Sequence, residues 1–460
     1  MSHSVYNKIL NRGARLNREI VDQNNNPDTV WTFILSSLKF RSKFTIQCLK
    51  ASNLRPLNIF LIIPVLLAFF ALFADAAPLS LQDAVNSALK QNPDIASYKA
   101  AWESAKAKIP QTLSLDDPKI GIEYEQAESL SNLESGMKMY TASQMIMFPG
   151  KIYAKYQMAA ASAQMWEYRY KSKKLEILNE TKSLYYNLFF LDRAITIMKD
   201  VKNYLSRIKK VAEAKYVIGS VMQSDMLQAN IEYLLANNEL TNLEQERSAK
   251  ESKLKAFMGV NDNNIIETDS SLEVLATLES LSSLRDLALE NRPELLAMKA
   301  EIAMKDYSHL DSKMEFFPDI DLGVKNRVGD GWDAMASISI PLYFWKQGYS
   351  FSSAGFEREM AEATFRNMVN MTSWEVTESY VMAESAKRTF LLYEESIVPQ
   401  SLQALNVALT AYQSGKTDFQ TLLQLERMYK ESKLKLYENQ VSLGKAIAWL
   451  ERITGKEMGR

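Results

Sequence analysis

Apolar positions beyond residue 80 follow a helical spacing over most of the chain and an alternating spacing in four short stretches. From residue 151 to about 214 the apolar side chains recur at steps of three and four residues, which is close to a heptad pattern. This stripe includes Ile177, Leu184, Leu188, Leu191, Ile195, Met198, Val201, Leu205, Ile208 and Val211. Roughly sixty residues at 1.5 Å per residue give a helix of about 90 Å. No single compact core needs a helix of that length, so the pattern predicts an extended rod.

A second long helical pattern and two return patterns complete this design. Return helices are predicted over residues 222–258 and 417–452, each running antiparallel to the long helix before it. Pro399 lies inside the second long helical stretch, where a proline removes a backbone hydrogen bond and bends the helix. The sequence therefore predicts two long helical hairpins, the second with an interruption near Pro399.

Alternating apolar and polar positions predict four β-strands in two hairpins. The first pair covers about residues 118–126 and 137–147, and the second covers about 318–327 and 332–342. Strands of about ten residues have the length needed to cross a bilayer at the tilt of a barrel strand. Aromatic residues of the kind found at a membrane interface gather at the ends of the second hairpin, namely Phe316, Phe317, Tyr343, Phe344 and Trp345.

Two locations are compatible with these strands. Alternation alone fits two hairpins on a water-soluble sheet equally well, whereas the N-terminal signals described below favour a membrane. Four strands cannot close a barrel, and open strand edges are not tolerated in lipid. A membrane location therefore requires several chains to share one barrel.

The chain carries an internal duplication. Tyr216 and Gly219 recur as Tyr412 and Gly415, at an offset of 196. Each glycine follows a long helical pattern and can supply the left-handed residue that ends a helix, so both stretches predict the tip of a helical hairpin. The predicted organisation is a first repeat over 77–259 with its tip at 214–226, a linker over 260–283, a second repeat over 284–455 with its tip at 411–422, and a tail over 456–460.

The first 76 residues predict a targeting segment. Residues 1–56 hold nine Lys or Arg against three acidic residues and show no sustained periodicity, so they predict a basic extension that is disordered or lies upstream of a true translation start near Leu54. Residues 57–76 combine an apolar stretch with the Ala-rich exit of a secretory signal peptide. The alternative is a transmembrane anchor, for which an apolar stretch of seventeen residues is short.

Cleavage near Ala76 leaves 45 basic and 51 acidic residues and removes Cys48, the only cysteine. The mature chain then forms no disulfide, and its mildly acidic balance without a basic stripe argues against nucleic-acid binding. His309 stands beside Asp306 and Asp311 and is interpreted as a surface residue rather than a metal ligand. No nucleotide-binding, zinc-protease or hydrolase motif occurs, so we expect no catalytic residue, no metal site and no cofactor.

The methionines leave one alternative open. Met137, Met139, Met145 and Met147 fall on one face of a predicted strand, where a relay for a soft metal ion is conceivable. They lack histidine or cysteine partners, and methionine is also scattered through the helical patterns. Flexible packing is therefore the preferred interpretation.

Together these elements resemble the TolC family of outer-membrane efflux channels. The resemblance spans about residues 81–455 and rests on the duplicated order of elements, on the proline-containing openings at 91–93 and 291–293, and on the two Tyr-x-x-Gly tips. The stretch 143–151, S-Q-M-I-M-F-P-G-K, is similar to the strand exit in the branch that pairs with heavy-metal exporters.

The resemblance implies a mainly α-helical fold with a small transmembrane β part. Three copies would each give four strands to a twelve-stranded β-barrel, continued by a periplasmic α-helical barrel. It also implies a homotrimer in outer-membrane lipid, with a periplasmic adaptor and an RND-type inner-membrane pump docking at the helix tips. The residues expected at the docking tips are Tyr216, Gly219, Ser220, Tyr412, Gly415, Lys416 and Thr417.

The chain departs from the family at the tunnel gate. Members of the family commonly place carboxylates in the second tip, but the matching positions here are Thr421 and Gln424. Asp225 and Asp418 therefore join these two as gate candidates. Six carboxylates from three chains would repel anions and attract cations at a narrow mouth. The alternative is that both aspartates cap the return helices.

The sequence thus predicts the outer-membrane channel of a tripartite efflux system, a passive duct that performs no chemistry. The alternative is a periplasmic coiled-coil scaffold that bridges envelope layers without a pore. In a duct of this kind the choice of cargo would lie mainly with the pump.

Overall fold

The computed structural model describes residues 79–126, 129, 131, 136–260, 265–269, 272 and 278–456. The predicted basic extension, residues 1–56, and the predicted signal peptide, residues 57–76, lie outside the described residues. So do residues 457–460 of the predicted tail.

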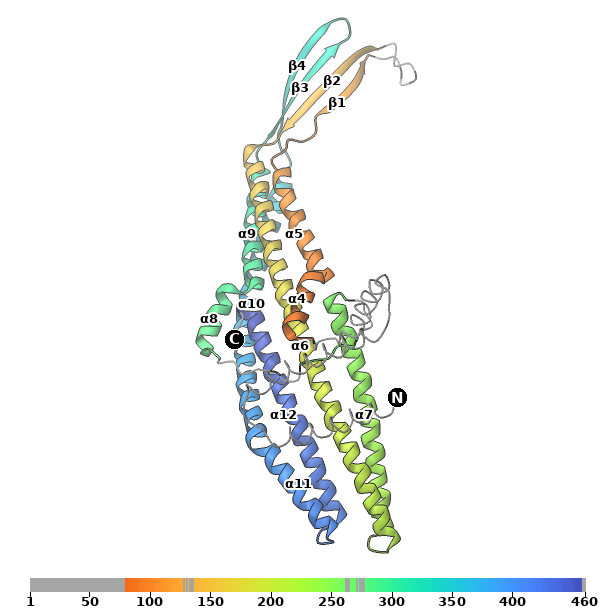
Figure 1. The fold of residues 1–460 in the computed structure, drawn as a ribbon. Helices are drawn as coiled ribbons and strands as arrows, with labels where there is room; N and C mark the ends of the chain where they lie inside the picture. Colours follow the sequence, from red (N-terminus) through yellow and green to blue (C-terminus); the bar gives the residue numbers. More distant parts are fainter. Residues whose placement is uncertain are drawn as a thin grey trace, which may run out of the picture. The chain divides into compact units, whose positions relative to one another are not determined.

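The described elements repeat one order twice. The first repeat contains α4 (Leu81–Gln91), α5 (Pro93–Gln111), β1 (Lys119–Glu125), β2 (Met137–Ile146), α6 (Pro149–Val217) and α7 (Gln223–Met258). The second repeat contains α8 (Leu281–Asn291), α9 (Pro293–Met314), β3 (Asp319–Arg327), β4 (Gly331–Ser339), α10 (Phe344–Leu392), a π-helical turn (Tyr393–Ile397), α11 (Val398–Gln413) and α12 (Phe419–Thr454). The mainly helical fold and the predicted order of elements are confirmed (Figure 1).

Local sequence explains where the shorter helices begin. The side chain of Ser80 accepts a hydrogen bond from the backbone N–H of Asp83, and that of Asn92 accepts from Asp94, so each satisfies an otherwise free N–H of the first turn. Proline occupies the first position of α5 and of α9, where its missing N–H costs nothing. The long return helices α7 and α12 both end in a left-handed glycine.

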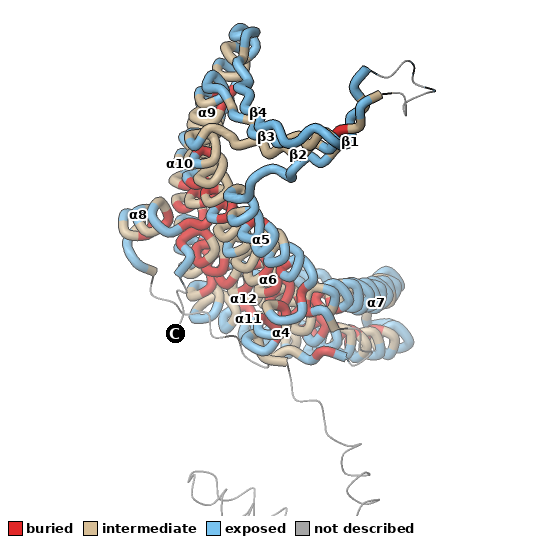
Figure 2. The backbone as a smooth tube through the Cα atoms, turned by 90° about the horizontal axis from the view of Figure 1, so that it is seen from above, coloured by how far each residue is buried: buried red, intermediate tan, exposed pale blue. Residues whose placement is uncertain are grey.

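The helix α6 is the structural centre of the described chain. It packs against α5 and α9 over one part of its length and against α7 and α12 over another. Buried apolar side chains accompany it through both regions, whereas β4 is exposed at every position (Figure 2). Burial of apolar surface therefore holds the helices together, and the strands contribute little to the core of a single chain.

The predicted interruption of the second long helix is confirmed. A π-helical turn, Tyr393–Ile397, separates α10 from α11 immediately before Pro399. Proline at this position has no N–H to donate to the preceding turn, and a wider turn accommodates the missing bond. α11 continues in a changed direction, whereas α6 passes the equivalent region without a break (Figure 1).

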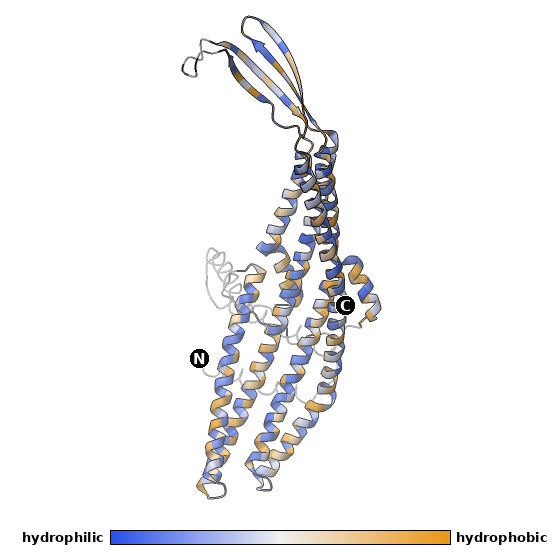
Figure 3. Cartoon of the chain, turned by 180° about the vertical axis from the view of Figure 1, so that it is seen from behind, coloured by the Kyte–Doolittle hydropathy of each residue, from blue (hydrophilic) through white to orange (hydrophobic). Residues whose placement is uncertain are grey.

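The four strands form one antiparallel sheet in the order β1-β2-β3-β4, so β2 and β3 join the two repeats. Figure 3 shows hydrophobic and hydrophilic residues interspersed along the strands. The register places most apolar members of the four alternations on the same face, with the strand methionines on the other. The apolar face carries Ile120, Ile122, Tyr124, Tyr140, Ala142, Ile146, Ile320, Leu322, Val324, Trp332, Ala334, Ala336 and Ile338. On the opposite face Lys325 forms an ion pair with Glu123 across β2 at 2.9 Å. Strand β4 ends at Ser339 rather than near residue 342, because Pro341 cannot donate to a strand partner.

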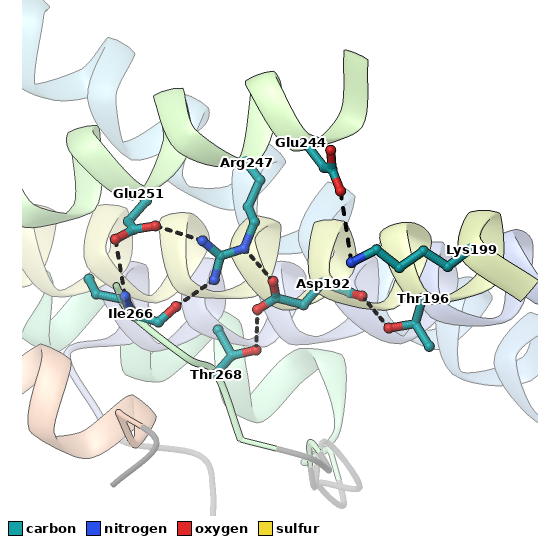
Figure 4. A network of polar contacts seen from close by, with 8 residues as sticks. All are labelled: Asp192, Thr196, Lys199, Glu244, Arg247, Glu251, Ile266 and Thr268. Carbon is teal, nitrogen blue, oxygen red and sulfur yellow. Dashed lines mark hydrogen bonds and ion pairs between the residues drawn. The ribbon is translucent and has the colours of Figure 1, made fainter. Parts of the chain in front are cut away.

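The described part of the linker is held firmly against the first repeat. Arg247 of α7 donates to Asp192 of α6 at 2.5 Å and to the carbonyl oxygen of Ile266 at 2.5 Å (Figure 4). Glu251 accepts from both Arg247 and the N–H of Ile266, and Thr268 donates to Asp192. The linker predicted over 260–283 ends at Ser280, which caps α8.

Among the described residues, no helix combines the length and apolarity needed to cross a membrane.

Candidate functional site

The two helical hairpins, α6–α7 and α11–α12, end in tips with the same backbone geometry. Gly219 and Gly415 have φ values of 73° and 72°. In the first tip, residues 216–222, the N–H of Ser220 donates to the carbonyl of Lys215 at 2.9 Å. In the second tip, residues 412–418, the N–H of Lys416 donates to the carbonyl of Ala411 at 2.8 Å. The predicted left-handed glycine is therefore present in both tips, and Figure 1 shows both tips at the same end of the helices.

The second tip is packed. Tyr412 is only 2% exposed, and its ring centroid lies 5.8 Å from that of Phe419. Lys215 from the first hairpin donates to the carbonyl oxygen of Tyr412 at 2.6 Å, and its Nζ lies 4.1 Å from the ring centroid. Burial, together with the nearby Asp225 carboxylate, raises the pKa of Tyr412. The Tyr412 hydroxyl has no hydrogen-bond partner among the described residues.

The first tip is open. Tyr216 is 39% exposed, and the two residues after it, Val217 and Ile218, are 83% and 77% exposed. Met222, at the start of α7, is also exposed. Ser220 uses its hydroxyl to bond the carbonyl of Lys215, within the tip itself. The first tip therefore presents a small apolar surface that nothing in the described chain covers.

The gate candidates divide between two arrangements. Asp418 caps α12, accepting a hydrogen bond from the N–H of Thr421 at 2.7 Å, and this bonding to Thr421 lowers the pKa of the aspartate. Asp225 lies in the first turn of α7, where Met222 is the cap position, so the alternative role of a helix cap fits Asp418 and does not fit Asp225. Gln424 is exposed on α12.

Side chains also link the two hairpins above the tips. Gln420 donates to Gln228 at 2.5 Å. Arg427 forms an ion pair with Glu232. Further along, Lys430 pairs with Glu239 at 3.5 Å. Each link joins α12 to α7, and the sequence did not predict them because both partners lie on polar helix faces that resemble ordinary solvated surface.

The aromatic residues expected at a membrane interface gather where the strands meet the helices. Phe317 stacks on Phe148 with a centroid separation of 4.6 Å. Tyr343 and Phe344 each pack edge-on against Trp345, at 5.2 and 5.6 Å. All of the predicted members are exposed, namely Phe316, Phe317, Tyr343, Phe344 and Trp345. Amphipathic or apolar rings exposed beside the apolar face of the sheet are typical of a lipid headgroup boundary.

The remaining candidates from the sequence, His309 and the strand methionines, lie apart from the tips in the described residues. No group of three His, Cys, Asp or Glu there could hold a metal ion. His309 of α9 is half-buried, and its ring lies tilted against that of Phe351 of α10, with the centroids 4.1 Å apart. Met137, Met139 and Met145 do lie on one face of the sheet, while Met147 falls beyond the end of β2.

Known proteins share this sequence pattern and geometry. A family model described as outer membrane efflux protein matches residues 84–260 and 284–456. The cobalt-zinc-cadmium resistance protein CzcC of Cupriavidus metallidurans is 19% identical over 392 residues, which cover 83% of this chain and 91% of that protein. Toxin and drug export protein A of Aggregatibacter actinomycetemcomitans is 19% identical over 285 residues, covering 58% of this chain and 61% of that protein.

Solved structures match over most of the chain. The channel protein CusC superposes with a TM-score of 0.72 at 13% sequence identity, covering 82% of this chain and 92% of that one. The open state of the MtrE outer membrane channel of Neisseria gonorrhoeae gives a TM-score of 0.69 at 14% identity, covering 83% and 90%. These matches establish the fold.

Proposed function

This chain belongs to the outer membrane efflux protein family, and on that premise we propose that three copies form a passive export duct that docks with a periplasmic adaptor and an inner-membrane pump. The protein is an outer-membrane efflux channel whose helices extend into the periplasm, as predicted from its resemblance to the TolC family. Its family and fold are those of channels rather than of enzymes.

The single observation that carries a barrel shared between copies is the unfinished sheet; the number of three copies comes from the resemblance to the TolC family. The larger apolar side chains on the apolar face of the sheet are mostly exposed, and β1 and β4 each keep one unpaired edge among the described strands. In lipid every backbone N–H and C=O needs a partner, so these edges require strands from other copies. β1 and β4 run in opposite directions, so β4 of one copy can continue the antiparallel order with β1 of the next. Three copies supply twelve strands.

The helices near the tips support the same closure. Between the hairpins α6 packs on α12, which leaves α7 and α11 at the two outer edges of this layer. α7 exposes Leu227, Ile231 and Leu234 along one face. α11 carries an open groove of about 640 Å³ lined by Leu402 and Val407, among others. An apolar stripe at one edge and an apolar groove at the other fit a ring in which each copy packs against the next.

Crosslinking across the strand edges tests the trimer. The sequence has a single cysteine, Cys48, so introduced cysteines can be followed without interference from the described chain. Ile122→Cys in β1 should be combined in turn with Ala334→Cys, Ala336→Cys or Ile338→Cys in β4. We expect at least one pair to give covalent dimers and trimers on a denaturing gel after oxidation in detergent micelles.

The matched control combines Ile122→Cys with Val324→Cys, since β3 lies inside the same sheet and is separated from β1 by β2. This control should stay monomeric on the gel. If all three β1–β4 pairs stay monomeric in protein that is folded by circular dichroism and conducts no ions in planar bilayers, the trimeric duct is wrong and the bridging scaffold is favoured.

The proposed gate lies at the tips, where Asp225 and Asp418 from three copies surround the mouth of the duct, with Thr421 and Gln424 beside them. Carboxylates around a narrow pore favour cations. The double variant Asp225→Asn, Asp418→Asn should lower the ratio of cation to anion permeability in single-channel recordings. Asp286→Asn on exposed α8 removes one charge far along the sequence from the tips and serves as the control. Equal lowering by the control would contradict the gate.

Cargo is assigned to the pump in this proposal. The relatives carry names that refer to cobalt, zinc and cadmium in one case and to toxins and drugs in the other. The duct itself has no metal-binding cluster among its described residues. We therefore propose an RND-type pump as the partner that selects substrate, with the similarity to CzcC favouring metal ions.

A further inference from the structure

A buried glutamate lies where the two helical hairpins meet. Glu426 of α12 is only 4% exposed, and its Oε1 has no hydrogen-bond partner among the described residues. Tyr204 of α6 contributes a hydroxyl that is likewise buried and without a partner there. Both residues line a partly open cavity of about 430 Å³ between α6, α11 and α12. Two unsatisfied polar groups around one cavity are unusual for a protein core and point to a functional role.

The charged groups around Glu426 do not neutralise it. On α12 its neighbours are Arg427 and Lys430, but each of these already pairs with a carboxylate of α7. Those carboxylates, Glu232 and Glu239, repel a negative charge on Glu426. Arg427 and Lys430 are therefore already paired with carboxylates of α7, and neither forms an ion pair with Glu426.

The remaining neighbours come from α6 and α11. Besides Tyr204, α6 brings Asp200 and Arg207 to the cavity, and Lys433 of α12 lines it as well. The side chains that α11 brings are uncharged, namely Leu402, Leu405, Asn406, Leu409 and Gln413. Burial raises the pKa of Glu426 to about 7; Lys430 and Arg427 oppose this effect, and the α7 carboxylates Glu232 and Glu239 add to it.

We propose that Glu426 is a proton-operated latch between the two helical hairpins. In the neutral form it lets α12 pack closely against α6 and α7, which keeps the tips together. When Glu426 loses its proton, the buried charge disfavours this packing and the hairpins separate more readily. The latch would set how easily the proposed duct opens at its tips. Its effect on conductance rests on the proposed function, whereas its effect on helix packing does not.

The direction of the pH effect on hairpin packing follows from the linkage between protonation and packing. A carboxyl group whose pKa is raised from 4.5 to about 7 in the packed state stabilises packing fully only below pH 4.5. That stabilisation is lost as the pH rises towards 7. Between pH 6 and pH 8 the equilibrium for opening should therefore increase about tenfold. The tips should be tighter in acid and looser in mild alkali.

Hydrogen–deuterium exchange tests the latch without a chemical probe attached to the protein. Exchange of the α12 amides near residue 426 should be followed by mass spectrometry in the purified, detergent-solubilised protein at pH 6 and pH 8, after correction for intrinsic exchange rates. Wild-type protection should fall about tenfold between the two values. Glu426→Gln, which is permanently neutral, should keep its protection at both. Glu426→Asp retains a carboxyl group and should keep the pH step.

Glu431→Gln is the matched control, because Glu431 is an exposed glutamate on the same helix. It should behave as the wild type does. A pH step that persists unchanged in Glu426→Gln, or that disappears in Glu431→Gln, would overturn the latch. Single-channel recordings of the same proteins separate the two proposals: absent conductance with an intact Glu426-dependent step refutes the duct alone, and conductance with no such step refutes the latch alone.

Discussion

The two helix tips share a backbone and differ in almost everything attached to it. Gly219 and Gly415 have nearly the same φ, and neither has an atom within 4 Å of the position where a Cβ would stand. Yet Tyr412 is enclosed by Phe419 and Lys215, while its counterpart Tyr216 lies open beside two exposed apolar residues. The two tips therefore share the same turn conformation but differ in packing. The second tip is packed, and the first presents an exposed apolar surface.

We propose that this difference gives the two tips separate tasks. Tyr412 is buried and contacts Lys215 of the other hairpin. This contact opposes separation of the hairpins, which suits a gate. Exposed apolar side chains at the end of a helical hairpin suit contact with a partner protein. The predictions below probe this division, beginning with the largest expected effect.

Tyrosine truncation should affect the two tips very unequally. Tyr412→Ala removes a buried ring and should lower the free energy of unfolding by about 3 kcal/mol. Tyr216→Ala should lower it by less than about 1 kcal/mol, since an exposed ring loses little packing. Denaturant unfolding of both variants measures the difference. Tyr412→Phe should be nearly neutral because the hydroxyl has no partner to lose. Equal losses at Tyr216 and Tyr412 would erase the distinction between the tips.

Polar substitution of the open tip should weaken docking. The double variant Val217→Ser, Ile218→Ser should reduce affinity for the purified periplasmic adaptor about tenfold, which corresponds to about 1.4 kcal/mol. Thermal stability should not change, because both side chains are exposed. Binding can be measured by surface plasmon resonance. Ser414→Ala in the second tip is the control, and a larger loss there would reverse the assignment of docking to the first tip.

Replacing either tip glycine with alanine should lower the free energy of unfolding by the same amount. Gly219→Ala and Gly415→Ala each place a Cβ on a left-handed residue with no neighbouring atoms in the way. Each should therefore cost about 1 kcal/mol from backbone strain alone. Matching changes in unfolding midpoint would confirm that the turns are equivalent. A clear inequality would show that the surroundings of one turn, and not its backbone, decide the cost.

Acid should loosen the start of α12 more than the start of α7. The hydrogen bonds to Thr421 hold the pKa of Asp418 below its ordinary value, so the cap contributes above pH 3.8 and is lost as the pH falls through the lowered value. Amide exchange in the first turn of α12 should rise below about pH 4, and Asp418→Ala should show that faster exchange already at pH 6. Asp225→Ala should change α7 less, because Asp225 is not at the cap position.

Local patterns in the sequence were sufficient for the elements. Period-two alternation located all four strands, and glycine after a long apolar stripe located both tips. Small differences at the ends follow from prolines, as at Pro341 after β4. No strand register was predicted from the sequence; the observed register keeps most apolar positions on one face, which a slip of a single residue would not do.

Features that depend on contacts between distant parts of the chain were not predicted from the sequence. Tyr216 and Tyr412 occupy equivalent positions, and packing against Phe419 and Lys215 distinguishes Tyr412 from Tyr216. Arg247 gave no signal, because one of its partners is a backbone carbonyl of the polar linker. The burial of Glu426 was predictable from the sequence. It lies four residues after Leu422 on an apolar helix face, where a single acidic residue indicates a buried charge.

The pairing of β2 with β3 constrains the order in which this protein can be built. Met139 is aligned with Arg327, roughly 190 residues further along the chain, and contacts of such long range form slowly. The first strand pair emerges during synthesis and export long before its neighbour exists, with its apolar side chains bare. Until the second repeat has been made, β2 therefore has an unpaired edge where β3 will later bind, and such an edge favours association with other chains.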